Sequence, residues 1–303
     1  VVNATGVWID ALRDQALTAM GQKHNTAPMV RPSQGVHLVV ERKTFPLQQA
    51  VLVPKTSDGR VLFALPWLGA TLIGTTDTPR NDAPIEPQAT AEELHFLFEQ
   101  TRISLGVTLR PEDVRSVWVG LRPLVGQAQG ATSQMSREHL IVRDAPGFYT
   151  VTGGKWTTYR NIAADVLQHI ERQADLPTAP AQANTEQHRL VGAPVEGKSM
   201  HSVSDAPGLH LWGSEAEAVQ QLPGPQNHLG MGLTEAMVRF AARSEWALTV
   251  EDMLARRWRA LFLDARQAAC MAPAVAALLQ EETGLDPQLD AFLALCKQYT
   301  LAD

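Results

Sequence analysis

Cysteine is scarce in this 303-residue sequence, which contains only Cys270 and Cys296. Both lie inside apolar helical patterns, so we expect two buried structural thiols in a reducing compartment rather than a disulfide framework. The sequence also lacks CxxC, HExxH and any other spacing typical of metal ligands. We therefore predict no metal site.

Long apolar runs and an excess of basic residues are absent as well. No segment approaches the roughly 18 consecutive apolar residues of a membrane-spanning helix. The net charge of −6 argues against general nucleic-acid binding, which requires a basic face. The apolar and charged fractions, 45% and 19%, are those of an ordinary soluble globular protein.

The first ten residues, VVNATGVWID, lack an initiator methionine and the basic and apolar segments of a signal peptide. Val1 and Val2 have the pattern of a strand already in progress. We therefore expect that the chain is a piece of a longer protein.

Short β-branched segments separated by polar turns predict strands in the first half of the chain. The first four lie close together, at residues 36–40, 50–54, 61–66 and 71–76. Because their connections are too short for crossover helices, the pairing should be antiparallel, with a hairpin turn at 57–60. Further strands are predicted at 114–124, 139–143 and 148–152.

Helical spacing of apolar residues predicts a helix at 90–105, where Thr90 and Glu93 form a capping box, and another at 156–173. A polar stretch containing prolines follows and resembles a linker. Beyond it we predict helices at 214–221, 233–243, 249–262, 265–282 and 287–298. The predicted fold class is α+β, with a mostly antiparallel sheet domain at 1–175, a linker at 176–208 and an all-α C-terminal domain at 209–303.

The segment VTGGKWTTYR, residues 151–160, combines two glycines with a lysine and two hydroxyls at the start of a helix. Adjacent glycines allow a sharp turn and a close approach by a flat ligand. The first helical amides carry partial positive charge, to which Lys155 adds a full charge. This arrangement favours a site for an anionic group. The alternative is an ordinary helix N-terminus with a solvated lysine.

Two single residues interrupt apolar strands and are further candidates. Arg122, in VGLRPL, needs a counter-charge if it is partly buried, and its planar guanidinium suits phosphate or carboxylate; the alternative is an internal salt bridge. His37, in GVHLVV, is a usable proton acceptor if it faces a pocket; the alternative is a histidine that only satisfies a backbone hydrogen bond.

Together these motifs resemble the FAD-dependent glycerol-3-phosphate dehydrogenases of the glycine oxidase and D-amino-acid oxidase superfamily. The matching segments run in the family's order and cover nearly the whole chain: VVNATGVWID, RPSQGVHLVV, VLFALPWLGATLIGTTDT, VGLRPL, TVTGGKWTTYR and EWALTVEDMLARRWRALFLDA. The resemblance implies a C-terminal fragment that lacks the GxGxxG unit, with a substrate-binding sheet beside remnants of the FAD-binding domain. Without that unit we expect the isolated chain to be nearly colourless.

The resemblance also implies roles for individual residues. It makes His37, Arg122 and Lys155 catalytic, with His37 as the base and with Arg122 and Lys155 binding the substrate. The FAD contacts that it implies are Thr5, Gly6, Gly153, Gly154, Lys155, Trp156 and Thr157.

By the same resemblance, the enzyme oxidises sn-glycerol 3-phosphate to dihydroxyacetone phosphate and passes electrons to the quinone pool. It would be cytoplasmic and attached peripherally to the inner face of the cell membrane, and a homodimer is compatible with it. Two alternatives remain open. One is a glycerol-3-phosphate oxidase that uses oxygen, and the other is a non-catalytic fragment that binds a phosphate or a partner.

Overall fold

The computed structural model describes residues 1–22, 28–56, 59–126, 138–173, 185–193 and 201–301. Their contacts divide the chain into two compact units. Unit 1 comprises residues 1–35, 77–87 and 119–188, and unit 2 comprises residues 36–76, 88–118 and 189–303. The long strands β2 (Val30–Glu41) and β7 (Val114–Val125), which pair with each other, each have residues in both units.

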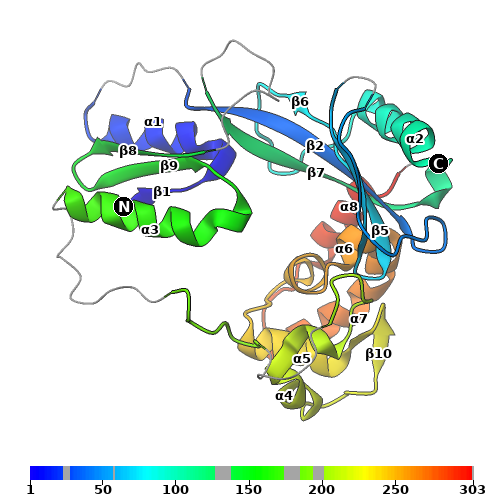
Figure 1. Cartoon of the computed structure of the whole chain (residues 1–303). Coiled ribbons are helices and arrows are strands. Elements are labelled where there is room, and N and C mark those ends of the chain that lie inside the picture. The colour runs from blue at the N-terminus through cyan, green and yellow to red at the C-terminus, as the bar shows by residue number, and fades with distance from the viewer. Residues whose placement is uncertain (23–27, 57–58, 127–137, 174–184, 194–200, 302–303) are drawn as a thin grey trace. The chain divides into compact units, whose positions relative to one another are not determined.

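Unit 1 contains a three-stranded sheet in the order β1 (Val2–Asn3), β9 (Phe148–Gly153), β8 (His139–Ala145). Strand β1 is parallel to β9, whereas β8 and β9 are antiparallel. Helices α1 (Ile9–Ala19) and α3 (Tyr159–Arg172) lie on opposite faces of this sheet (Figure 1). The β9 residues explain this arrangement, because successive strand side chains point to opposite faces. Phe148 clusters with Leu17 of α1, and the next residue, Tyr149, clusters with Val166 of α3.

The sheet of unit 2 is antiparallel, in the order β3 (Val51–Val53), β4 (Leu62–Trp67), β5 (Ala70–Gly74), β2. It confirms the predicted strands, although β2 is longer than the predicted segment. At its other end, β2 pairs within unit 1 with the short strand β6 (Thr78–Pro79). Residues Ser57 and Asp58 of the predicted hairpin turn lie outside the described residues.

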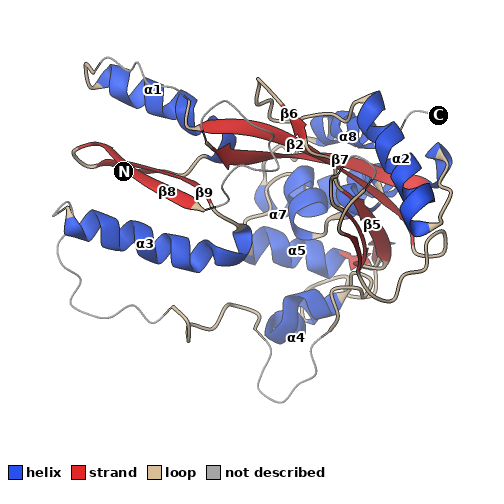
Figure 2. Ribbon diagram, turned by 45° about the horizontal axis from the view of Figure 1, so that its top comes forward, coloured by secondary structure: helices blue, strands red, loops and turns tan. Residues whose placement is uncertain are grey.

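Helix α2 (Ala91–Leu105; Figure 2) begins as predicted, with a capping box. The Glu93 N–H donates to Thr90 Oγ1 at 3.2 Å, and the Thr90 N–H donates to Glu93 Oε2 at 3.0 Å. The second carboxylate oxygen of Glu93 accepts a hydrogen bond from Thr76 Oγ1, which itself accepts the Val36 N–H. One buried carboxylate therefore both caps α2 and connects it to the sheet.

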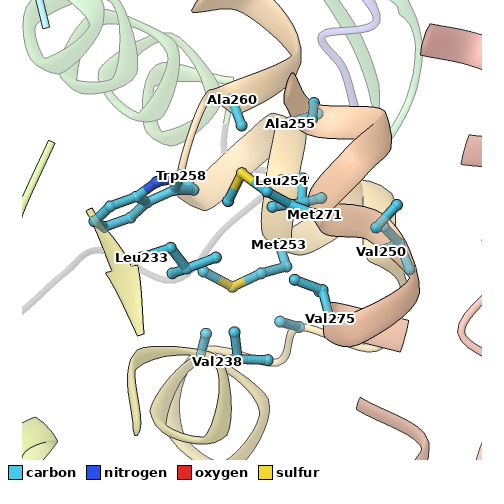
Figure 3. Close-up of a cluster of buried hydrophobic side chains, with 14 of the residues drawn as sticks. Leu233, Val238, Val250, Met253, Leu254, Ala255, Trp258, Ala260, Met271 and Val275 are labelled. Carbon is cyan, nitrogen blue, oxygen red and sulfur yellow. The ribbon is translucent and has the colours of Figure 1, made fainter. Parts of the chain in front are cut away.

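The C-terminal part of unit 2 is helical and encloses the largest apolar cluster among the described residues. In Figure 3, Leu233, Met253, Trp258, Met271 and Val275 converge on its centre. This confirms the predicted helical C-terminal region, to which the structure adds one short hairpin. Its elements are α4 (Ala216–Gln220), β10 (His228–Gly230), β11 (Leu233–Thr234), α5 (Glu235–Ser244), α6 (Ala260–Leu263), α7 (Ala265–Thr283) and α8 (Leu289–Tyr299).

The helix predicted at 249–262 is interrupted. The Thr249 hydroxyl caps its start by accepting the Asp252 N–H at 3.0 Å, and a wide helical turn, Asp252–Arg257, follows. Trp258 is fully buried, and its Nε1–H donates to the Met231 carbonyl at 3.1 Å. Arg259 then takes a left-handed conformation (φ 63°), and α6 begins after it. Burial of the indole and its hydrogen bond stabilise a break that apolar spacing does not indicate.

The two cysteines differ in environment. Cys296 is buried, as predicted, but Cys270 is exposed, so the prediction of two buried thiols was wrong for Cys270. Apolar neighbours at helical spacing identify the buried stripe of α7 only approximately, and Cys270 lies at its solvent edge.

Part of the predicted linker hydrogen-bonds to the β4–β5 turn of unit 2. The Leu68 N–H donates to the Val203 carbonyl at 2.8 Å, and the Gly69 N–H donates to the Ser204 carbonyl at 3.0 Å. Residues 174–184 and 194–200 of this stretch lie outside the described residues. The boundaries at 175 and 208 stay predictions. Within the described ranges, no helix has the length and apolar character needed to cross a bilayer.

Candidate functional site

The parallel pairing of β1 and β9 brings two predicted cofactor-binding segments of unit 1 to one edge of the sheet. Asn3 pairs with Thr150, so Thr5 and Gly6 follow the end of β1 at the edge where Gly153 closes β9. Ligands of open α/β sheets bind at the carboxyl ends of parallel strands. The loop after β1 is held in place, since Thr5 Oγ1 donates to Asn3 Oδ1 at 2.8 Å and Asn3 Nδ2 donates to the Ile9 carbonyl at 3.0 Å.

Gly153 and Gly154 both have left-handed backbone angles, φ 77° and 78°. A Cβ on Gly153 would lie 2.4 Å from the Glu138 carbonyl oxygen, and one on Gly154 would lie 2.5 Å from Ile162 Cδ1. Only glycine meets both the conformational and the steric requirement. The sharp turn directs the chain from β9 into the short 3-10 helix Trp156–Thr158 and then into α3.

The residues that follow this turn fit an anionic or polar cofactor edge. Within the described part of the chain, the Lys155 side chain is exposed and forms no ion pair. Trp156 is 86% exposed, and its ring stacks on Tyr159 at 5.7 Å. The hydroxyl of Thr152, just before the glycines, is buried with no hydrogen-bond partner among the described residues. A free ammonium, first-turn amides and an unsatisfied hydroxyl all offer donors here.

Arg122 lies elsewhere in unit 1, with its guanidinium directly over Gly35. A Cβ at Gly35 would lie 2.4 Å from Arg122 Nη2 and 2.7 Å from Cζ. The side chain is about one-third exposed, and its Nη1 is 3.8 Å from Asp77 Oδ1. Asp77 also accepts a short hydrogen bond from Ser33 Oγ. Arg122 is thus a partly buried arginine near the Asp77 carboxylate, at the limit of ion-pair distance, and its side chain is partly accessible to solvent.

His37 lies in unit 2, opposite Gly74 in the β2–β5 pairing. A Cβ at Gly74 would lie 2.5 Å from its Cδ2 atom, so the strand leaves room for the imidazole only with glycine at this position. The ring stacks on Trp118, with centroids 4.2 Å apart and an interplanar angle of 18°, and also contacts Phe63. This packing fixes the plane of the imidazole while leaving the residue half-buried.

The structure therefore brings together Thr5, Gly6 and the Gly153–Thr157 turn at one sheet edge of unit 1, and it places Arg122 on Gly35 in the same unit. His37 belongs to unit 2. Sequence reasoning missed the partners of these residues. It did not single out Asp77 beside Arg122, and no pattern pointed to Ser33 beside Asp77 or to Trp118 beside His37.

Comparison with known proteins decides the family. The model described as "FAD dependent oxidoreductase" matches residues 1–160, which is more than half of the chain. The chain belongs to this FAD-dependent oxidoreductase family. A second model, described as the C-terminal domain of alpha-glycerophosphate oxidase, matches residues 183–289.

Relatives of this family member carry consistent names. A mitochondrial glycerol-3-phosphate dehydrogenase of Arabidopsis thaliana is 32% identical over 93% of this chain and 48% of its own length. The mitochondrial enzyme of Bos taurus is 33% identical over 94% of this chain and 41% of its own. The chain thus spans about half the length of these curated relatives.

A solved structure supports the same fold. The glycerol-3-phosphate dehydrogenase of Bacillus halodurans, solved as a complex with FAD, superposes with a TM-score of 0.76 at 25% sequence identity. The superposition covers 99% of this chain and 62% of that one. The donors after Gly154 fit the cofactor that the family uses.

Proposed function

We propose that this protein takes part in the FAD-dependent oxidation of sn-glycerol 3-phosphate to dihydroxyacetone phosphate, with a quinone as electron acceptor. The names of the relatives support the substrate. The observation that carries the proposal is the Arg122 guanidinium over Gly35, because a planar, partly buried fork suits a phosphate monoester.

Each candidate residue has a role in this proposal. FAD, when bound, supplies the acceptor for the C2 hydride of the substrate. Arg122 binds the substrate phosphate, and Asp77 orients its guanidinium. His37 takes the proton of the C2 hydroxyl. Lys155 binds substrate and also, with the Gly153–Gly154 turn and Thr157, stabilises negative charge on the edge of the cofactor. Thr5, Gly6 and Trp156 hold the cofactor.

The proposal is tested by turnover of flavin-loaded protein that contains this chain. Dihydroxyacetone phosphate should form from sn-glycerol 3-phosphate with a quinone analogue as acceptor. The Arg122→Lys variant should lose about 1–3 kcal/mol of substrate binding, because lysine keeps the charge but not the two-pronged hydrogen bonding. Arg102→Lys, on the exposed face of α2, is the matched control. An unchanged KM in Arg122→Lys would assign Arg122 to a structural role.

A second candidate is an oxidase that passes electrons to oxygen. The C-terminal family model, which is named for alpha-glycerophosphate oxidase, favours it. Peroxide produced in step with dihydroxyacetone phosphate would support the oxidase, and quinone reduction without peroxide would support the dehydrogenase.

The quinone acceptor leads to a proposal about location. Because quinones dissolve in lipid, we propose peripheral attachment of the protein to the inner face of the cell membrane through an amphipathic surface. Activity that stays wholly in the soluble fraction after gentle lysis would contradict attachment and favour the oxidase.

A further inference from the structure

Unit 2 contains a cavity of about 950 Å³ that the proposed activity does not use. Its walls come from the β4–β5 turn, from residues 201–214 and from the stretch Arg256–Arg259 after the wide helical turn. Trp67, Leu209 and Trp212 give it an apolar side, and Arg257 and Arg259 give it a cationic side. This volume is in the range of small-molecule sites.

The arginines of this cavity differ in how far their charge is compensated. Arg256 is paired with Glu251 at 2.6 Å and with Asp252 at 3.3 Å. Arg257 donates to the main-chain carbonyls of Asp252 and Glu245, which hold the guanidinium in place. Its Nη1 also lies 4.0 Å from Asp252 Oδ1, at the limit of ion-pair distance. Arg259 donates to the Arg257 carbonyl at 2.8 Å and, within the described ranges, has no carboxylate partner.

Glu245 is the acidic residue on the same wall. Burial raises the pKa of its carboxyl, and the nearby Arg257 and Trp212 side chains oppose this only in part. In the cavity lining, the guanidinium groups of Arg257 and Arg259 thus outnumber this one carboxyl, and the cavity favours an anion.

A buried indole supplies an independent observation. Trp212 is only 6% exposed and lines the cavity. Its Nε1–H makes no well-aligned hydrogen bond in the described part of the chain, although the side chain lies close enough to the Glu245 carboxyl to lower its pKa. The ring is fixed from behind by stacking on Trp258, with centroids 5.7 Å apart. A buried donor without an acceptor costs roughly 1–3 kcal/mol, so an acceptor on a ligand would offset this cost.

The backbone is also unusual at this place. Leu68 and Arg259, both on the cavity wall, have left-handed angles, φ 48° and 63°, that side chains other than glycine seldom adopt. Such conformations concentrate at ligand sites, where the surrounding structure enforces them.

We propose that this cavity binds an organic anion whose acidic group is bound by Arg257 and Arg259 and whose apolar body packs against Trp67 and Leu209, with Trp212 Nε1 donating to it. The site lies wholly within unit 2 and is distinct from the Arg122 region of unit 1. It requires neither FAD nor glycerol 3-phosphate for binding.

Titration calorimetry of the 303-residue chain with phenyl phosphate tests the proposal. One equivalent should bind to the Arg122→Gln variant, whose proposed substrate site is removed. Inorganic phosphate and benzyl alcohol should each bind to that variant more weakly, since each lacks one half of the ligand. Arg259→Gln should weaken binding roughly 10- to 100-fold, as expected for loss of a hydrogen bond to a charged group. Trp212→Phe, which keeps the ring and removes the donor, should weaken it about 2- to 10-fold.

Two controls separate this cavity from other anion sites. Arg122→Gln removes the proposed substrate site, so the equivalent of phenyl phosphate that this variant still binds is assigned to the cavity. Arg102→Gln should leave phenyl phosphate binding intact. The proposal is overturned if phenyl phosphate does not bind, if inorganic phosphate binds equally well, or if Arg122→Gln abolishes binding. Unchanged affinity of Trp212→Phe for phenyl phosphate would also overturn it. If Arg259→Gln does not fold, the Trp212→Phe variant tests the proposal in its place.

Discussion

At the scale of single residues, the contact between Arg122 and Gly35 is the most specific feature of the proposed substrate site. A methyl group at Gly35 would overlap the guanidinium and displace it. We expect Gly35→Ala to lower kcat/KM for glycerol 3-phosphate, mainly by raising KM. The loss should correspond to about 1–3 kcal/mol of binding free energy, as if the hydrogen bonds from Arg122 to the substrate phosphate were lost.

Gly120→Ala is the matched control for this substitution. Gly120 lies on β7, two residues before Arg122, and a Cβ there would meet nothing within 4 Å. Its steady-state kinetics should equal those of the wild type. Equal kinetics for Gly35→Ala as well would show that the position of Arg122 does not matter to substrate binding.

His37 provides a second prediction at this scale. His37→Asn should lower kcat by about 10²–10⁴-fold with a smaller change in KM, because a base matters when the hydroxyl proton leaves. An imidazole accepts a proton only when it is neutral, so wild-type kcat should fall on the acid side and the variant should lose that dependence. His95→Asn, on the exposed face of α2, is the control.

A structural histidine would give a different result. Replacing a structural histidine would lower the melting temperature and leave both kcat and KM of the folded enzyme nearly unchanged. If His37→Asn keeps most of its turnover and its kcat still falls at acidic pH, another group is the base.

The two thiols should react very differently. Burial raises the pKa of the Cys296 thiol to about 12, so almost no thiolate exists at about pH 8. Cys270 is exposed and should react rapidly with a disulfide reagent at that pH. We expect one fast equivalent in the native chain and a second only after denaturation. A fast equivalent that persists in Cys270→Ser would contradict the burial of Cys296.

At the scale of elements, Glu93 connects helix and sheet. It is 4% exposed, and its carboxylate accepts from the Thr90 N–H and from the Thr76 hydroxyl. Glu93→Ala therefore removes the carboxylate half of the capping box and leaves a buried hydroxyl short of one partner. We expect the free energy of unfolding to fall by about 2–4 kcal/mol in a urea titration. Glu92→Ala, an exposed position in the same first turn, should change it by less than about 0.5 kcal/mol. Equal losses in the two variants would refute the connecting role.

The elements themselves could largely be predicted, because strand alternation and helical spacing are local signals. The start of α2 was predictable to the residue, since Thr90 and Glu93 carry the capping signal in sequence. The break after Arg257 was not, because it depends on a hydrogen bond from Trp258 to the distant Met231 carbonyl. The candidate site follows the same rule. The GGKW segment and Arg122 stood out because their signal lies in the local sequence, whereas Asp77 and Trp118 are recognised only through the residues that the fold places beside them.

At the scale of the whole molecule, the chain belongs to an FAD-dependent oxidoreductase family, and the proposed function gives it a substrate site and one edge of a flavin site. The most direct test is an anaerobic titration of flavin-loaded protein containing this chain with sn-glycerol 3-phosphate. The flavin absorbance should bleach in proportion to added substrate, dihydroxyacetone phosphate should appear in equal amount, and glycerol, which lacks the phosphate, should have no effect. Bound FAD that stays oxidised at saturating glycerol 3-phosphate would contradict the proposed function.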